Sequence, residues 1–192
     1  DLGVKACRAD KPDVLVAGLG LGYTAQAALD YTHVARVDVV DYLQPIIRWH
    51  EEGLIPQAPD QPNLKADKRC RFIHGDFFAL AKSDAGFDAD HPHRHYDAVL
   101  IDIDHTPYRL LNQGANAETD GFYTTEGLAA LARHLRPGGV VGLWSDEAPD
   151  EAITALIGPA FAESWAEPVV FPNPLQDNRM ITQTVYLGRK TV

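Results

Sequence analysis

The segment DVLVAGLGLGYTAQAAL, residues 13–29, constrains the fold of this chain more than any other. It places three alternate glycines, Gly18, Gly20 and Gly22, between an apolar run and an alanine-rich run. This order is typical of the first strand, turn and helix of a nucleotide-binding α/β domain, where glycines let the backbone approach a ligand. Because Tyr23 stands where a dinucleotide fingerprint has its last glycine, the spacing favours a nucleoside with a short tail over a pyrophosphate.

Short apolar runs alternate with helix-like stretches along most of the chain. The predicted strands are Val14–Ala17, Ala35–Val40, Cys70–His74, Tyr96–Ile101, Val140–Trp144, Trp165–Phe171 and Met180–Leu187. The predicted helices are Thr24–Leu29, Pro45–Glu51, Phe77–Ala81, Thr125–Leu135 and a short one near Asp150–Ile157. Strands that alternate with helices form a parallel sheet covered on both faces, and the last two strands suggest a closing antiparallel pair. We therefore expect one doubly wound α/β domain over residues 1–192, with a seven-stranded, mostly parallel, Rossmann-like sheet.

Composition and charge narrow the classes of function. A net charge of −10 argues against a nucleic-acid partner and suits a small cationic substrate. No apolar run approaches the ~20 residues that span a bilayer, so no membrane partner is expected. Two cysteines at no metal or disulfide spacing predict reduced thiols and a cytoplasmic protein. The alternate histidines of HPHRH, residues 91–95, predict a solvated loop, and we expect no metal site.

Carboxylates follow three further predicted strands. Asp41 directly follows the second strand, about twenty residues after the glycines, where a carboxylate accepts both ribose hydroxyls. Asp76 follows the third strand next to Phe77, and a carboxylate beside an aromatic ring can bind the amino group of a stacked adenine. Asp102 follows the fourth strand, where it could orient or deprotonate an amine nucleophile. Because the carboxyl ends of parallel strands meet at one edge of a sheet, we expect a shared ligand site.

Each of these acids also has a structural interpretation. Asp41 and Asp76 can cap helices, and Asp102 can bind a backbone amide at the start of a loop. Asp104, two residues after Asp102, is a candidate for binding the substrate or an ordinary loop residue. Asp97 opens the fourth strand at the far end of the sheet, and we expect it to be structural. The segment Ile103–Gly121 is long for a connection and predicts a lid over the strand ends.

The segments VLVAGLGLGYT, VVDYLQPIIRWH, RFIHGDFF, YDAVLIDID and FYTTEGLAALARHLRPGGVV occur in an order that resembles the spermidine synthase (polyamine aminopropyltransferase) family. That family has the class I S-adenosylmethionine-dependent methyltransferase fold. The resemblance runs from about Asp13 to Trp144. It implies the strand order 3-2-1-4-5-7-6, with the last strand antiparallel.

The resemblance also implies a co-substrate and roles for named residues. The co-substrate would be decarboxylated S-adenosylmethionine or S-adenosylmethionine itself, with no metal. The cofactor-binding residues would be Gly18, Gly20, Gly22 and Tyr23 of the turn, Asp41 at the ribose, and Asp76 and Phe77 at the adenine. Asp102 would activate the attacking amine of a polyamine such as putrescine, with Asp104 as a substrate-binding acid. A homodimer is one assembly compatible with this family.

Three departures from the family pattern leave the reaction open. The family's turn reads G-G-G-D-G-G and its aspartate binds the amine of the aminopropyl tail, whereas this chain has Leu21 there. The family's second acid, three residues after the first, is replaced by His105. Because only about a dozen residues precede the first predicted strand, we expect the family's small N-terminal β-rich segment to be absent or truncated in this sequence. Aminopropyl transfer, methyl transfer and non-catalytic binding of an adenosyl ligand therefore remain alternatives for a spermidine synthase-like chain.

Overall fold

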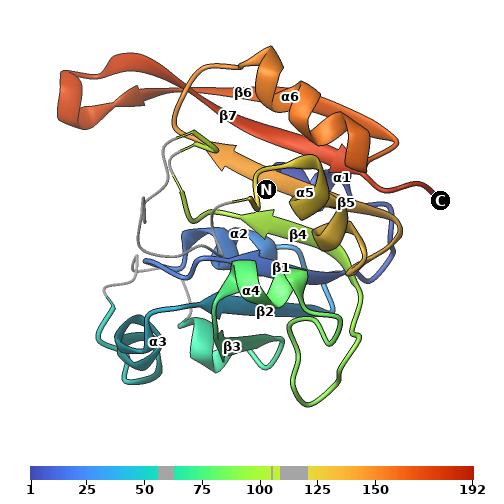
Figure 1. Cartoon of the computed structure of the whole chain (residues 1–192). Helices are drawn as coiled ribbons and strands as arrows, with labels where there is room; N and C mark the ends of the chain where they lie inside the picture. The colour runs from blue at the N-terminus through green and yellow to red at the C-terminus, as the bar shows by residue number, and fades with distance from the viewer. Residues whose placement is uncertain (56–62, 105, 109–120) are drawn as a thin grey trace.

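The structure of the chain is a computed structural model that describes residues 1–55, 63–104, 106–108 and 121–192 (Figure 1). Its strands are β1 (Asp13–Ala17), β2 (Arg36–Asp41), β3 (Cys70–His74), β4 (Tyr96–Ile101), β5 (Leu135–Ser145), β6 (Glu163–Asn173) and β7 (Arg179–Arg189). Its α-helices are α1 (Leu2–Ala6), α2 (Tyr23–Leu29), α3 (Gln44–Glu51), α4 (Phe77–Lys82), α5 (Thr125–Ala132) and α6 (Glu151–Ile157). Three short 3-10 helices are η1 (Leu64–Ala66), η2 (Gly158–Ala160) and η3 (Pro174–Gln176).

The seven strands form one sheet in the order β3-β2-β1-β4-β5-β7-β6. Strand β7 runs antiparallel to β5 and to β6, and the other neighbouring strands pair in parallel. This topology confirms the predicted fold class, the implied strand order and the antiparallel last strand. Within the described ranges, no helix is both long and apolar enough to cross a membrane.

Two apolar cores lie on opposite faces of the sheet because the side chains of a strand point alternately to either side. In β1, Val14 and Val16 belong to the core under α1, α2 and α3, whereas Leu15 and Ala17 belong to the core under α4, α5 and α6. Figure 1 shows α4, α5 and α6 in front of the sheet and α1 and α2 behind it. The central strands are therefore buried on both faces, and the candidate site residues lie at the carboxyl ends of these strands.

The largest difference from the predicted elements lies around residues 133–139. We expected a helix to run from Thr125 to Leu135, but α5 ends at Ala132 and β5 already begins at Leu135. The carbonyl of His134 accepts the N–H of Tyr96 at 2.9 Å, so the backbone enters the sheet before another helical turn can form. The short helix α1 was not predicted.

Asp97 has the structural role expected of it. Its Oδ2 accepts the backbone N–H of Asp13 at 2.8 Å and also bonds the Arg136 guanidinium. These contacts tie the amino ends of β1 and β4 to the start of β5, at the edge of the sheet opposite the candidate site.

Candidate active site

The glycine turn leaves β1 with a close approach at Gly18. This residue has φ +93°, and a Cβ built on it would lie 2.3 Å from the backbone carbonyl oxygen of Asp102. Only glycine therefore lets the turn pass so near the end of β4. Gly20 differs, because at φ +44° its Cβ would meet no atom of the described residues within 4 Å. As far as the described residues go, the lack of a side chain at Gly20 thus leaves open space beside the turn.

A buried histidine, His50, contacts the backbone of the same turn. His50 is 1% exposed, and its Nε2 lies 2.9 Å from the carbonyl oxygen of Gly20. Because a carbonyl oxygen only accepts, Nε2 carries the proton of this hydrogen bond. A Cβ at Gly22 would lie 3.0 Å from Cε1 of the His50 ring and 2.6 Å from Leu64. The turn is therefore held by a hydrogen bond and by close packing at once.

Asp41 joins the glycine turn to the ends of β2 and β3. Its Oδ2 accepts the N–H of Leu19 at 2.8 Å, and its Oδ1 accepts the N–H of Leu43 at 2.7 Å. The Asp41 carbonyl accepts the N–H of Gly75 at 3.0 Å. Each carboxylate oxygen has a further lone pair, so the group can still accept hydroxyl hydrogen bonds. The orientation of Asp41 is thus fixed by the backbone, while its acceptor capacity is not exhausted.

Asp76 and Phe77 begin α4. Asp76 caps this helix, because its Oδ1 accepts the N–H groups of Phe78 at 2.9 Å and Ala79 at 3.3 Å. The Phe77 ring is 3% exposed and stacks on Phe87 with 5.3 Å between ring centroids. The structural interpretation of Asp76 as a helix cap is confirmed. The buried Phe77 ring offers no exposed face to an adenine, so the stacking role predicted for it would require this ring to leave the core.

Asp102 and Asp104 follow β4 but have different surroundings. Asp102 is exposed, and the Thr24 hydroxyl donates to its Oδ2 at 2.5 Å. Asp104 is 4% exposed and accepts the hydroxyl of Tyr123 at 2.8 Å. Burial and the neighbouring Asp104 hold the pKa of Tyr123 well above its usual value, so Tyr123 remains a donor. A substrate-binding role for Asp104 would therefore require it to leave Tyr123.

The structure brings several of the predicted site residues into contact. The glycine turn touches Asp41 through Leu19 and the backbone of Asp102 through Gly18. Asp76 begins the next helix along this edge of the sheet, and Tyr23 is exposed at the first position of α2. His105 and most of the predicted lid, residues 109–120, lie outside the described residues.

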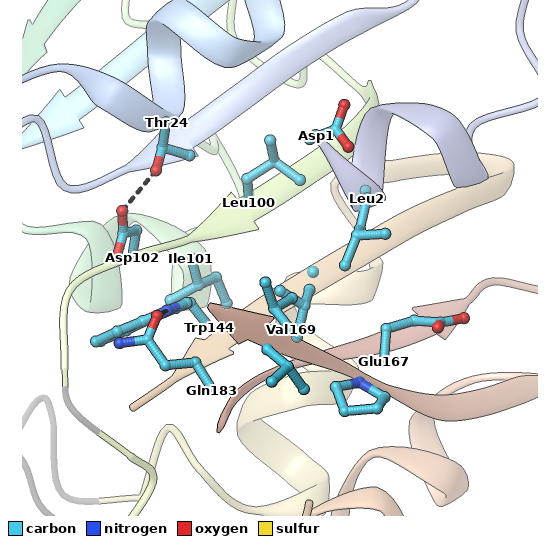
Figure 2. A pocket seen from close by; sticks show the side chains of 15 residues that line it. Asp1, Leu2, Thr24, Leu100, Ile101, Asp102, Trp144, Glu167, Val169 and Gln183 are labelled. Carbon is cyan, nitrogen blue, oxygen red and sulfur yellow. Dashed lines mark hydrogen bonds between the residues drawn. The ribbon is translucent and has the colours of Figure 1, made fainter. Parts of the chain in front are cut away.

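A cavity of about 540 Å³ opens beside Asp102 on the face of the sheet that α1 partly covers (Figure 2). Its apolar lining includes Leu100, Ile101, Trp144, Val169 and Val185. The indole N–H of Trp144 donates to Oε1 of Gln183 at 3.2 Å, which orients that amide on the cavity wall.

Sequence reasoning missed Thr24, Gln183 and Glu167 at this cavity. Thr24 alone carried a readable signal, a hydroxyl two residues after the last glycine of the turn. Within the described residues, no group of three or more histidine, cysteine, aspartate or glutamate side chains is arranged to hold a metal ion.

Comparisons with known proteins define the class. No family model matches the chain. The spermidine synthase of Thermotoga maritima superposes with a TM-score of 0.67 and 14% identity, covering 100% of this chain and 56% of that one. Human methyltransferase-like protein 13, in complex with SAH, superposes with a TM-score of 0.64 and 16% identity, covering 100% of this chain and 80% of that one. The fold is therefore that of the class I methyltransferases.

A curated relative narrows this class. Polyamine aminopropyltransferase 2 of Pseudomonas aeruginosa is 27% identical over 161 residues, which are 80% of this chain and 41% of that protein. The chain thus spans less than half the length of this relative. The chain is thus spermidine synthase-like in that its sequence is similar to that of an aminopropyltransferase and its fold is that of the class I methyltransferases.

Proposed function

We propose that the chain forms the catalytic domain of a transferase that binds an adenosyl sulfonium ligand and transfers an alkyl group from it to a small cationic amine. The observation that carries this proposal is the contact of one glycine turn with two acids. Leu19 of the turn bonds the Asp41 carboxylate at 2.8 Å, and Gly18 packs against the backbone of Asp102. An acid suited to ribose hydroxyls and an acid suited to an amine thus flank the same turn.

The proposed reaction is a direct displacement at a carbon attached to the sulfonium. A nitrogen–carbon bond forms, the carbon–sulfur bond breaks, and the sulfur leaves as a neutral thioether. Asp102 accepts the proton that the attacking amine gives up. The Thr24 hydroxyl, 2.5 Å from Oδ2 of Asp102, fixes the carboxylate so that its other oxygen can face the amine. Holding both reactants in line accounts for much of the rate.

The group transferred depends on the tail of the sulfonium ligand. We favour decarboxylated S-adenosylmethionine and aminopropyl transfer to a polyamine such as putrescine, because the curated relative is an aminopropyltransferase. Methyl transfer from S-adenosylmethionine is the second candidate. Leu21 favours it, because this side chain is 56% exposed on the turn where the family carries an acid for the aminopropyl amine.

The first experiment is calorimetric titration with each of the two ligands. Tighter binding of decarboxylated S-adenosylmethionine supports aminopropyl transfer, and tighter binding of S-adenosylmethionine supports methyl transfer. Asp41→Asn should weaken the preferred ligand about tenfold, because a neutral amide replaces a charged acceptor at the ribose. If neither ligand binds, the proposal fails.

Asp102→Asn separates an enzyme from a non-catalytic binding protein. The variant should bind the adenosyl ligand like the wild type but lose about a hundredfold or more in turnover of ligand and amine, because an amide cannot accept the proton. Turnover that survives this substitution would contradict the role of Asp102. A cytoplasmic location and a homodimer belong to the same proposal, and sedimentation of the purified chain tests the dimer.

A further inference from the structure

Most of the cavity beside Asp102 has no part in binding the adenosyl ligand as proposed above. Its lining includes neither the turn glycines nor Asp41 and Asp76, but it does include Asp102 and Thr24, which the proposed function assigns to the reacting amine. The cavity continues from there along β4, β5, β7 and β6, with α1 on its other side. At about 540 Å³ it lies within the ~300–1,000 Å³ typical of small-molecule sites.

The strand register shows how far the cavity extends across the sheet. Leu100 of β4 lies opposite Gly142 of β5, so Asp102 comes level with Trp144, two residues further along. Trp144 pairs with Val185 of β7, and Val185 pairs with Glu167 of β6.

These residues form one row on the same face of the sheet. Three strand spacings of about 4.8 Å each separate the backbone at Asp102 from that at Glu167, roughly 14 Å in all. Figure 2 shows the two acids at opposite ends of the lining side chains.

Charge and apolar surface are arranged along this row in a definite pattern. The charged side chains that line the cavity are those of Asp1, Asp102 and Glu167, all acidic. The Asp1 carboxylate already forms an ion pair with Lys5 at 2.7 Å, which leaves Asp102 and Glu167 as the two lining acids that can bind a cationic ligand. Trp144 and its neighbours form an apolar floor between these two acids. Such a site suits a molecule with a cation at each end and an apolar body.

Glu167 is held in a fixed orientation by its own strand. The indole N–H of Trp165, two residues earlier in β6, donates to Oε1 of Glu167 at 3.0 Å. Asp104 is buried and accepts the Tyr123 hydroxyl, so it is not the second acid of this site. Glu167 is the lining acid that lies across the cavity from Asp102.

We propose that this cavity is the acceptor site and that Glu167 is its distal anchor, which selects amines carrying a second cationic group far from the reacting nitrogen. The inference rests on the proposed function, since it takes Asp102 as the residue that receives the reacting amine. With hydrogen bonds of about 3 Å at each end, the row leaves roughly 8–11 Å between the two nitrogens. A four-carbon diamine such as putrescine spans five bonds, about 6 Å at ~1.2 Å per bond, so it can react at Asp102 but does not reach Glu167. At the same ~1.2 Å per bond, diamines of six to eight carbons span about 8–11 Å, so they reach both acids, as does a triamine of similar length.

The test is calorimetric titration with linear terminal diamines of four, six, eight and ten carbons and with octylamine. The wild type should bind the eight-carbon diamine about tenfold more tightly than the four-carbon diamine or octylamine, because only the long diamine contacts both acids. Glu167→Gln, which keeps an oxygen for Trp165, should abolish this preference and leave the four-carbon affinity unchanged.

Glu163→Gln is the matched control, because Glu163 lies on the same strand, outside the cavity, and pairs with Arg189 at 3.1 Å. It removes the same charge and should keep the preference for long diamines. A length preference that survives Glu167→Gln, or equal affinity for octylamine and the eight-carbon diamine, would overturn the anchor.

An adenosyl-ligand titration of the same protein preparation separates the two proposals. If the adenosyl ligand binds and no amine does, the acceptor site alone is wrong. If neither binds, the proposed function fails with it.

Discussion

Gly18 and Gly20 stand two residues apart in one turn, yet the surroundings require glycine for different reasons. At Gly18 a methyl group would lie 2.3 Å from the backbone oxygen of Asp102, directly after β4, which cannot move without disturbing the end of that strand. We expect Gly18→Ala to lower the free energy of unfolding by about 2 kcal/mol or more, through the clash and through φ +93°. Urea unfolding measures this loss.

Gly20→Ala should have the opposite profile. Its methyl group meets no atom of the described residues within 4 Å, so among these residues only the strain of φ +44°, about 1 kcal/mol, opposes folding. The added methyl group occupies the space beside the turn, and we expect the affinity for the adenosyl ligand to fall about tenfold or more. Calorimetric titration of the folded variant measures it. Unchanged affinity would show that the ligand does not approach the turn at Gly20.

The positions of Asp41 and Asp102 were predictable because Asp41 ends one apolar strand, Asp102 directly follows another, and parallel strands end at one edge of the sheet. Phe77 marks the limit of such reasoning. An aromatic residue beside a candidate ligand-binding acid can face either the ligand or the core, and α4 has only six residues, too few for periodicity to decide. The tertiary packing against Phe87 determines where the ring lies.

At the scale of one element, α4 tests whether Asp76 does more than begin a helix. Serine caps a helix as well as aspartate does but is too short to reach a ligand that Asp76 contacts. Asp76→Ser should therefore keep the free energy of unfolding within about 0.5 kcal/mol of wild type and lower the adenosyl affinity about tenfold.

Asp76→Ala is the companion variant, because alanine can neither cap nor bind. It should lose about 1 kcal/mol of stability as well as the affinity. Thermal unfolding and ligand titration, run on both variants, separate the two roles. Wild-type affinity in Asp76→Ser would reduce Asp76 to a helix cap.

The boundary between α5 and β5 shows why element ends resist prediction. The predicted start of this helix at Thr125 is confirmed, and Oγ1 of Thr124 caps it by accepting the N–H of Gly127 at 3.1 Å. The end was wrong because the apolar spacing continues to Leu135, while Leu135 in fact pairs with Tyr96 in the sheet. A local sequence pattern can predict a helix cap, which lies next to its helix, but it cannot predict the distant strand with which Leu135 pairs.

At the scale of the whole molecule, Glu167 could not have been found from the sequence. It is an ordinary acid in a half-exposed strand, and its distance from Asp102 depends on the register of β6 on β7 and of β7 on β5. Both registers are set by pairing between segments far apart in the chain. The cavity likewise forms only when the sheet and α1 are assembled, and no sequence motif predicts it.

An ion network distant from the candidate site links β2, β3 and the segment that precedes β4. It should make the stability of the fold depend on pH. Asp88 has a side chain 1% exposed, and Arg71 of β3 and Arg94 contact its Oδ2 at 2.7 and 2.8 Å. Arg71 also donates to Asp38 of β2 at 3.1 Å. Burial alone would raise the pKa of Asp88, but the hydrogen bonds from Arg71 and Arg94 outweigh it and hold that pKa well below its usual value.

A pKa that is lower in the folded than in the unfolded chain gives Asp88 a stabilising contribution above pH ~4 that is lost as the pH falls below that value. Asp88→Asn should therefore cost about 3 kcal/mol at pH 7, because two arginines lose their charged partner, and this difference should shrink between pH 4 and pH 2. Asp84→Asn is the control: its exposed carboxylate pairs with Arg133 at 3.6 Å, and the variant should stay within about 0.5 kcal/mol of wild type. Urea unfolding across this pH range measures these differences. If the free energy of unfolding of Asp88→Asn varied with pH in parallel with that of the wild type, Asp88 would not be the source of the acid sensitivity.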